Sequence, residues 1–266
     1  LERGRSVEKR RQDVEKFWET GLLDPASNVQ FGEGGAGTFS DGKLNTVVKD
    51  PSGRNQFVLE TFVHYGAPEE ITYENKPHIG TDVLSQVIGN MRKDLIAKGA
   101  EFHFESCVKD LVIENGRIAA VVTEEETYPA SAVILALGHS ARDTFEMLDA
   151  KKEIPMEVKN FAVGFRVEHP QTMIDTIMYG DYRGAKLPAS PYKVTSNFPN
   201  GRGVYSFCMC PGGYVVNASS EEGRSCVNGM SYSGRNGANA NSAIIVSVTP
   251  QDFGADDPLA GMRYQR

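Results

Sequence analysis

Residues 31–42 read Phe-Gly-Glu-Gly-Gly-Ala-Gly-Thr-Phe-Ser-Asp-Gly, and Lys43 follows directly. Five of these residues are glycine, and few of the side chains suit a hydrophobic core. Glycine accepts positive φ and lets backbone N–H groups approach a ligand closely, so successive amides can line a pyrophosphate or the edge of an aromatic ring. We therefore interpret this stretch, called the glycine loop below, as a loop shaped around a bound molecule.

The glycine loop also supplies side chains suited to such a ligand. Thr38 and Ser40 add hydroxyl donors, and Lys43 can neutralise negative charge or lie near a ring nitrogen. The candidate ligand contacts in the loop are Gly34, Gly35, Ala36, Gly37, Thr38, Ser40, Asp41 and Lys43. The alternative is an ordinary flexible surface loop, which the absence of Ser/Pro-rich flanks disfavours.

Upstream, the chain predicts the end of a strand running into a helix. Ser6 is a candidate cap for a helix to about Thr20, and Gly21 is a candidate stop. In dinucleotide-binding folds an acidic residue at a strand end accepts hydrogen bonds from a ribose hydroxyl. Glu2, followed by Arg3, occupies such a position, although a solvated surface glutamate is the alternative. The preceding Gly-x-Gly-x-x-Gly turn is not in the sequence, and we expect the chain to be a fragment.

Downstream, the pattern alternates between helix and strand. Residues 49–77 are interpreted as an excursion, and Thr81 to about Gly99 as an amphipathic helix. Asn115-Gly116 between two apolar runs predicts a β-hairpin. Residues 132–137 are a continuous apolar run, typical of a strand buried on both faces of a parallel sheet.

The end of that run is a further candidate contact with the ligand. It continues into a glycine turn and a helix to about Leu148. The candidate contacts are Ala136, Gly138, His139 and Ser140, and a simple strand-to-helix turn capped by Ser140 is the alternative.

The fold class that this order predicts is α/β. Residues 1–150 are expected to form an incomplete Rossmann-like dinucleotide-binding domain, with a parallel sheet and a β-hairpin layer. Residues 151–266 alternate short strand-like segments with Gly, Ser and Asn, and are expected to form a mixed, β-rich domain.

Composition excludes several functional classes. The chain has 28 basic and 35 acidic side chains and a net charge of −7, and lacks the basic stripe that nucleic-acid binding requires. Its apolar runs are far shorter than the roughly 20 residues that span a bilayer. Four cysteines are too few for a disulfide scaffold, so we expect a cytoplasmic protein.

Cys208 and Cys210 form the one motif that suggests thiol or metal chemistry. A single Cys-x-Cys is a weak zinc signal, and we predict no metal site. Strand alternation would place both side chains on one face, as small buried residues, with redox chemistry as the alternative. The five histidines are scattered and give no support to a hydrolase triad.

Several segments together carry a resemblance to a known family. They are LERGRSVEKR (1–10), GEGGAGTFSDGKLNT (32–46), KPHIGTDVL (76–84), ILALGHSARDTFEML (134–148), NFAVGFRVEHPQ (160–171) and GRGVYSFCMCPGGYVVNASS (201–220). With these segments the chain resembles the bacterial FAD-dependent dehydrogenase family, flavoproteins that share the glutathione-reductase type of FAD fold. Members carry glycine-rich FAD-contacting segments at both ends that this sequence lacks, so the chain resembles the middle of such a protein.

The resemblance implies roles for particular residues. Glu2 would hold the adenosine ribose, and the glycine loop would run along the pyrophosphate and flavin. Val108 would offer its backbone N–H and C=O to the adenine edge, and residues 136–140 would pass near the dinucleotide. Residues after about 150 would cover the isoalloxazine ring, and no residue is assigned a catalytic role.

The resulting prediction is an FAD-dependent oxidoreductase that moves a hydride between a small organic substrate and FAD. NAD(P)H is the candidate electron donor, and the fragment alone is expected to be inactive. Two alternatives stay open. One is a non-catalytic module that binds FAD or another ligand, and the other is a flavin-dependent RNA-modification enzyme, which the acidic charge balance disfavours.

Overall fold

The computed structural model describes residues 1–44, 49–181 and 187–266. The helical elements are α1 (Val7–Thr20), η1 (Ala36–Phe39), α2 (Arg54–His64), η2 (Glu69–Thr72), α3 (Thr81–Ala97), α4 (Arg142–Ala150), α5 (Gln171–Tyr179), α6 (Pro250–Phe253) and α7 (Ala260–Gln265). The strands are β1 (Asp110–Glu114), β2 (Arg117–Val122), β3 (Thr127–Pro129), β4 (Phe161–Pro170), β5 (Thr195–Asn197), β6 (Gly203–Cys210), β7 (Tyr214–Asn217), β8 (Val227–Met230) and β9 (Asn239–Val248). In the part of the chain so described, no helix is long and apolar enough to cross a membrane.

The two principal predicted helices are confirmed. Helix α1 ends at Gly21, whose φ of 73° is the left-handed conformation typical of a helix C-terminus. Helix α3 begins at Thr81, one residue after the N-cap Gly80. The Thr81 hydroxyl does not cap the helix but donates to the Ser40 carbonyl, at 3.1 Å, and so fastens α3 to the glycine loop. Helix α2 and η2 form the excursion over residues 49–77.

The Asn-Gly hairpin is also confirmed. Strands β1 and β2 pair antiparallel around Asn115 and Gly116, whose φ values of 51° and 73° suit a type I′ turn. Strand β3 adds a third antiparallel strand to this small sheet.

The predicted strand over residues 132–137 is not formed in the structure. The segment is extended but belongs to none of the three sheets, and Ile134 is 93% exposed. A strand needs neighbouring backbone to accept and donate hydrogen bonds, and within residues 1–44, 49–181 and 187–266 none pairs with this run. Residues 101–106 likewise stay outside the sheets, although their backbone bonds to Glu2 and Gly4. Every strand pair among the described residues is antiparallel, so the Rossmann-like parallel sheet stays a prediction.

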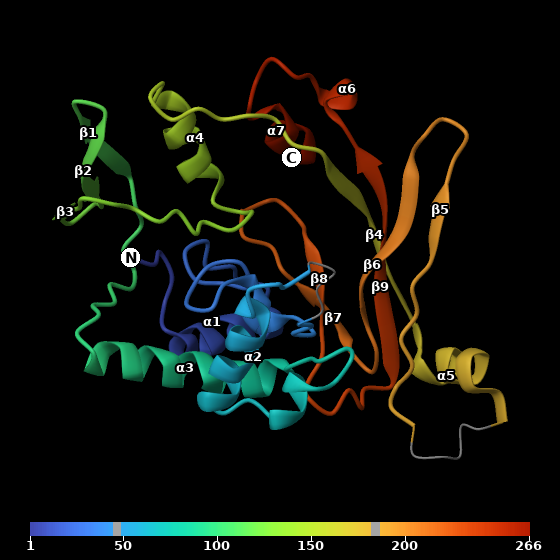
Figure 1. Cartoon of the computed structure of the whole chain (residues 1–266). Helices are drawn as coiled ribbons and strands as arrows, with labels where there is room; N and C mark the ends of the chain where they lie inside the picture. The colour runs from blue at the N-terminus through green and yellow to red at the C-terminus, as the bar shows by residue number, and fades with distance from the viewer. Residues whose placement is uncertain (45–48, 182–186) are drawn as a thin grey trace.

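The second half is rich in antiparallel strands. Its main sheet has the order β4-β9-β6-β5, and β7 and β8 form a separate hairpin. In Figure 1 this hairpin lies between the N-terminal helices and the large sheet. The register of β6 against β9 shifts between Phe207 and Cys210, so one extra residue bulges out of β6 at Cys208 and Met209.

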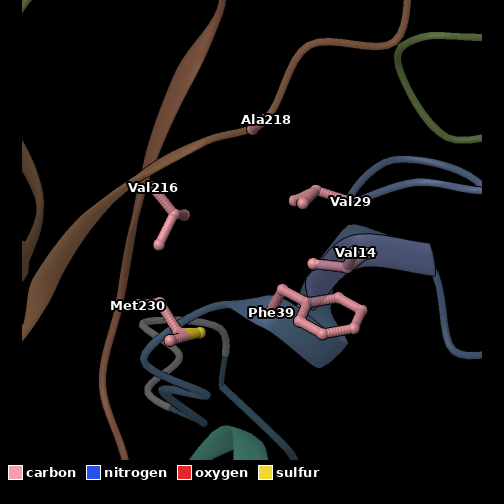
Figure 2. Packing of buried hydrophobic residues seen from close by; sticks show 6 residues of the cluster. All are labelled: Val14, Val29, Phe39, Val216, Ala218 and Met230. Atoms are coloured by element: carbon pink, nitrogen blue, oxygen red, sulfur yellow. The ribbon is translucent and has the colours of Figure 1, made fainter. Parts of the chain in front are cut away.

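One hydrophobic core joins residues from both predicted domains. Val14, Val29 and Phe39 pack with residues of the β7–β8 region, as Figure 2 shows. The partners are Val216, Ala218 and Met230. The glycine loop was expected to contribute little to a core, but Phe39 is only 2% exposed. The loop is therefore anchored between α1 and a hairpin that lies far away in sequence.

Candidate functional site

A cavity of about 630 Å³ opens beside the glycine loop. Most of its lining comes from four segments, residues 1–3, 30–36, 106–108 and 130–141, and Leu111, Val121, Tyr128 and Thr144 complete it. Its size falls within the range of about 300–1,000 Å³ that is usual for small-molecule sites.

Ten of the predicted site residues line this cavity. They are Glu2, Arg3, Gly34, Gly35, Ala36, Val108, Ala136, Gly138, His139 and Ser140. Their roles toward a ligand stay predictions, but residues up to 138 positions apart in the sequence line one cavity.

Glu2 is oriented by the backbone around it. Its Oε1 accepts hydrogen bonds from the N–H groups of Gly4, at 2.8 Å, and Gly32, at 3.0 Å. These bonds tie the N-terminal segment to the glycine loop. The described residues place no hydrogen-bond donor on the other oxygen, Oε2, which is thus available to a ligand hydroxyl.

Arg3 supplies positive charge at the mouth of the cavity. Its guanidinium pairs with Asp143 at 2.7 Å and lies over the ring of Phe31, 4.3 Å from the centroid. Burial opposes the charge on Asp143, but the hydrogen bond and charge of Arg3 outweigh it and lower the pKa of Asp143. Its guanidinium also donates to the Thr144 hydroxyl at 3.2 Å, so three partners hold Arg3 in place.

The opposite wall is formed by residues that follow the extended apolar run. The His139 ring contacts Gln265 Oε1 at 2.9 Å, and the Ser140 hydroxyl donates to Gln30 Oε1 at 3.3 Å. Gly138 has a φ of +67°, and a Cβ added there would meet no atom within 4 Å. The Val108 N–H has no acceptor among the described residues.

The five remaining predicted residues do not line this cavity. Gly37, Ser40 and Lys43 border a second cavity of about 460 Å³ against α3, together with Gly34. Thr38 is fully buried, and its hydroxyl has no hydrogen-bond partner in the described structure. The glycine loop thus lies between the two cavities, and only its first half lines the larger one.

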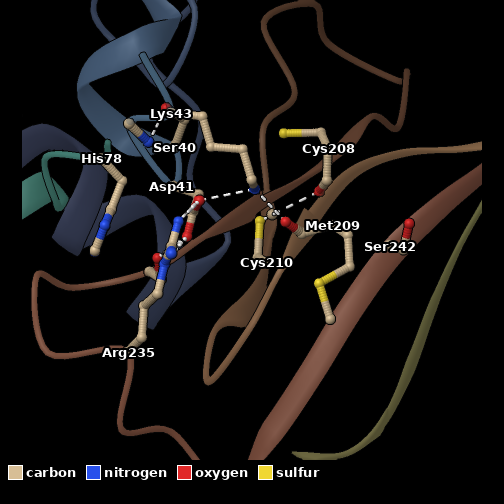
Figure 3. Close-up of polar contacts among 12 residues, drawn as sticks. Ser40, Asp41, Lys43, His78, Cys208, Met209, Cys210, Arg235 and Ser242 are labelled. Carbon is tan, nitrogen blue, oxygen red and sulfur yellow. Dashed lines mark hydrogen bonds and ion pairs between the residues drawn. The ribbon is translucent and has the colours of Figure 1, made fainter. Parts of the chain in front are cut away.

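Asp41 is a buried anchor of the glycine loop, and its contact with a ligand stays a prediction. It is 1% exposed and accepts hydrogen bonds from Ser231 and, in a bidentate pair, from Arg235. Lys43 Nζ lies 2.7 Å from Asp41 Oδ2, and Figure 3 shows these groups converging. Burial disfavours the charged carboxylate, but the bonds from Arg235 and the charge of Lys43 lower the pKa of Asp41 overall.

Sequence reasoning missed Arg10, whose guanidinium hydrogen-bonds to the glycine loop and to the residues just before it. Its side chain is fully buried and donates to the carbonyls of Asn28 (2.8 Å), Glu33 (2.6 Å) and Val29 (2.9 Å). Burial lowers the pKa of Arg10 to about 10, against the favourable charges of Glu2 and Glu33. The helical pattern gave one signal, because position 10 lies near the apolar positions 7 and 14 on α1.

Comparison with known proteins supports an FAD-related function. Residues 160–266 match the family described as FAD-dependent protein, C-terminal domain-like. This match supports an FAD-dependent family. It covers the β-rich half from just before β4 to the end of the chain, whereas the large cavity is lined by residues 1–144.

A protein of Clostridium beijerinckii, named "Uncharacterized protein", is 49% identical over 267 residues. The alignment covers 100% of this chain and 50% of the relative. The chain therefore spans half the length of the curated relative that it matches.

The large cavity fits the adenosine and pyrophosphate part of FAD. Glycines at positions 35 and 138 have positive φ and no neighbour within 4 Å of an added Cβ, so both leave room for a ligand beside the backbone. Glu2 Oε2 and the Val108 N–H offer an acceptor and a donor, and apolar side chains such as Val133 and Leu137 complete the wall. Among the residues that the structure describes, no group of aspartate, glutamate, histidine and cysteine side chains is arranged to hold a metal ion.

Proposed function

We propose that the chain binds FAD with its adenosine half in the 630 Å³ cavity, and that the whole protein is an FAD-dependent oxidoreductase. The observation that carries this proposal is the convergence of Glu2, the first half of the glycine loop, Val108 and residues 136–140 on one cavity. The match of residues 160–266 to an FAD-dependent family supports it independently, because that match lies in the other half of the chain.

Different cavity residues would bind different parts of FAD. Glu2 Oε2 accepts a hydrogen bond from a ribose hydroxyl, while Oε1 stays bound to Gly4 and Gly32. Backbone N–H groups of the glycine loop face the pyrophosphate, and Arg3 adds positive charge. Val108 offers its N–H and C=O to the edge of the adenine ring. When bound, FAD supplies the two-electron chemistry at its flavin ring.

The reaction proposed is hydride transfer between a small organic substrate and FAD, with NAD(P)H as the electron donor. A non-catalytic FAD-binding module is the second candidate, and reduction distinguishes the two. Under anaerobic conditions, NADH or NADPH should bleach the visible flavin band of the FAD-loaded protein. A flavin that stays oxidised with both donors and with a panel of organic reductants would favour the binding module.

Filling the cavity should weaken FAD binding. Ala136 is exposed on the cavity wall and is not glycine, so Ala136→Trp adds an indole without backbone strain. We expect the variant to bind FAD at least about tenfold more weakly than the natural chain, a loss of about 1.4 kcal/mol. The measurement is a titration of flavin fluorescence with the purified chain.

The matched control is Ala255→Trp, at an exposed alanine between α6 and α7 that does not border the cavity. It should bind FAD as the natural chain does. Equal affinity in Ala136→Trp and Ala255→Trp would place the flavin elsewhere and contradict the proposed site.

A further inference from the structure

The Cys208-Met209-Cys210 segment has an unusual backbone. It lies in the bulge of β6, where two residues replace one opposite Ser242 of β9. Cys208 has a φ of 48°, in the left-handed region that non-glycine residues seldom occupy. Bulges and strained residues of this kind are concentrated at functional sites, where they redirect a side chain.

The bulge separates the environments of the two thiols. In a regular strand Cys208 and Cys210 would lie on the same face, as the sequence suggested, but the bulge adds one residue to β6 between them and the positions paired with β9. Cys210 is fully buried, whereas Cys208 is partly exposed. A reagent from solvent can therefore reach Cys208 and not Cys210.

Two positively charged side chains, Lys43 and Arg166, bind the backbone at Cys208 and Met209. Lys43 of the glycine loop donates from Nζ to the carbonyl of Met209, between the two cysteines. Arg166 of β4 donates to the Cys208 carbonyl at 3.2 Å. In Figure 3 the Lys43 Nζ lies between the two sulfur atoms in the view shown. The nearby carboxylate of Asp41 is itself paired with Lys43 and Arg235.

These groups set the ionisation of the pair. The Cys210 thiol, as a hydrogen-bond donor, lowers the pKa of Cys208 most; burial opposes this, and Lys43 and Arg166 lower the pKa further. The same contact and burial raise the pKa of Cys210. Cys208 therefore ionises at a lower pH than an ordinary thiol, while Cys210 keeps its proton.

The backbone of two glycines packs closely against Cys210. A Cβ added at Gly229 would lie 2.7 Å from Cys210 Sγ, and one at Gly213 would lie 3.0 Å from Cys210 Cβ. The neighbouring Asn241 is fully buried, and its Nδ2 has no partner among the residues described. Only glycine at positions 213 and 229 leaves room for the Cys210 side chain.

We propose that Cys208 and Cys210 are a dithiol pair that reduces small organic disulfides, with Cys208 as the nucleophile and Cys210 as the resolving thiol. The partly exposed, strained Cys208 and the fully buried Cys210 two residues later carry this assignment. It does not require bound FAD and stands apart from the function proposed above.

The exchange proceeds in two steps. The Cys208 thiolate attacks one sulfur of the disulfide, forms a mixed disulfide and releases the first thiolate. Cys210 then attacks Cys208 Sγ, the second thiolate leaves, and the Cys210 proton goes to a released thiolate. The protein loses two electrons to become a Cys208–Cys210 disulfide, and the organic disulfide gains them to become a thiol and a thiolate.

Glutathione disulfide is the probe for this proposal. After incubation, the intact mass of the natural chain should fall by two hydrogens, with no lasting glutathione adduct. Cys210→Ser should instead accumulate one glutathione adduct, mapped to Cys208 by peptide analysis. Cys208→Ser should form neither product at this segment, and circular dichroism confirms that each variant is folded.

Cys226→Ser and Cys107→Ser are the matched controls, because each removes a free cysteine outside the bulge. Both should behave as the natural chain. A stable adduct on the natural chain, or an adduct on the exposed Cys226 that forms as fast as that on Cys208, would overturn the proposal.

The role of Lys43 is tested by the pH profile of alkylation. Iodoacetamide should modify Cys208 of the natural chain with a midpoint well below the value of about 8.5 for a free thiol. In Lys43→Met the midpoint should rise, and the rate near neutral pH should fall by up to about tenfold for one pKa unit. An unchanged midpoint would show that Lys43 does not stabilise the thiolate.

Discussion

Replacing Asp41 by Asn should lower the free energy of unfolding by about 3–5 kcal/mol, as expected when one partner of a buried ion pair is removed. The reason is that Arg235 and Lys43 both direct positive charge at this carboxylate, which is 1% exposed. An amide keeps the shape but offers one acceptor oxygen and no charge. Urea unfolding monitored by circular dichroism measures the difference.

The same substitution changes the response to acid. The pKa of Asp41 is lowered in the folded chain, so its contribution to stability is present above the unfolded value of about 3.9 and is lost as the pH falls through the folded value. The stability difference between the natural chain and Asp41→Asn should therefore shrink in acid. Glu15→Gln is the control, because its ion pair with Arg11 is exposed and should contribute less than about 1 kcal/mol. Similar losses in both variants would mean that the Asp41 network does not stabilise the fold.

Arg10→Met should be comparably destabilising, by about 3–5 kcal/mol, because it leaves buried acceptors without a donor. Three carbonyl groups, those of Asn28, Val29 and Glu33, lose the guanidinium that binds them. A Cβ at Gly32 would lie 2.3 Å from Arg10 Cδ, so the start of the glycine loop is in direct contact with this side chain. Besides the change in urea unfolding, amide hydrogen exchange in residues 28–35 should accelerate.

Arg11→Met provides the matched comparison on the next residue of α1. The Arg11 side chain is 63% exposed and pairs with Glu15 four residues on. Its loss should change stability by less than about 0.5 kcal/mol and leave exchange in residues 28–35 unchanged. If Arg11→Met and Arg10→Met lost equal stability, the bonds from Arg10 to the loop would not be the cause.

Local patterns predicted the local structure well. Helix α1, helix α3 and the Asn115-Gly116 hairpin follow from apolar spacing, a terminal glycine and a turn sequence, all of which act over a few residues. The convergence of Glu2, the glycine loop and residues 136–140 was also anticipated, through the resemblance to a family. The binding roles of these residues stay predictions.

Features that depend on distant partners could not be predicted in this way. Asp41 gave no sign that its partners would be Ser231 and Arg235, about 190 residues away. The apolar run 132–137 has the composition of a buried strand, but composition does not supply a neighbouring strand. The bulge at Cys208 and Met209 could not be predicted, because a bulge depends on the register between β6 and β9, which no single strand reveals.

The core shared by the N-terminal helices and the β7–β8 hairpin has a consequence for biosynthesis. Trp18 donates from its indole N–H to the carbonyl of Asn217, 199 residues later. At about 5–20 residues per second, a ribosome needs roughly 10–40 s to make the chain between these two contacts. Throughout that interval the apolar side of α1 and the ring of Phe39 lack the residues of the β7–β8 region that bury them in the folded protein. The nascent protein should therefore depend on holding chaperones that release it only after the hairpin has emerged.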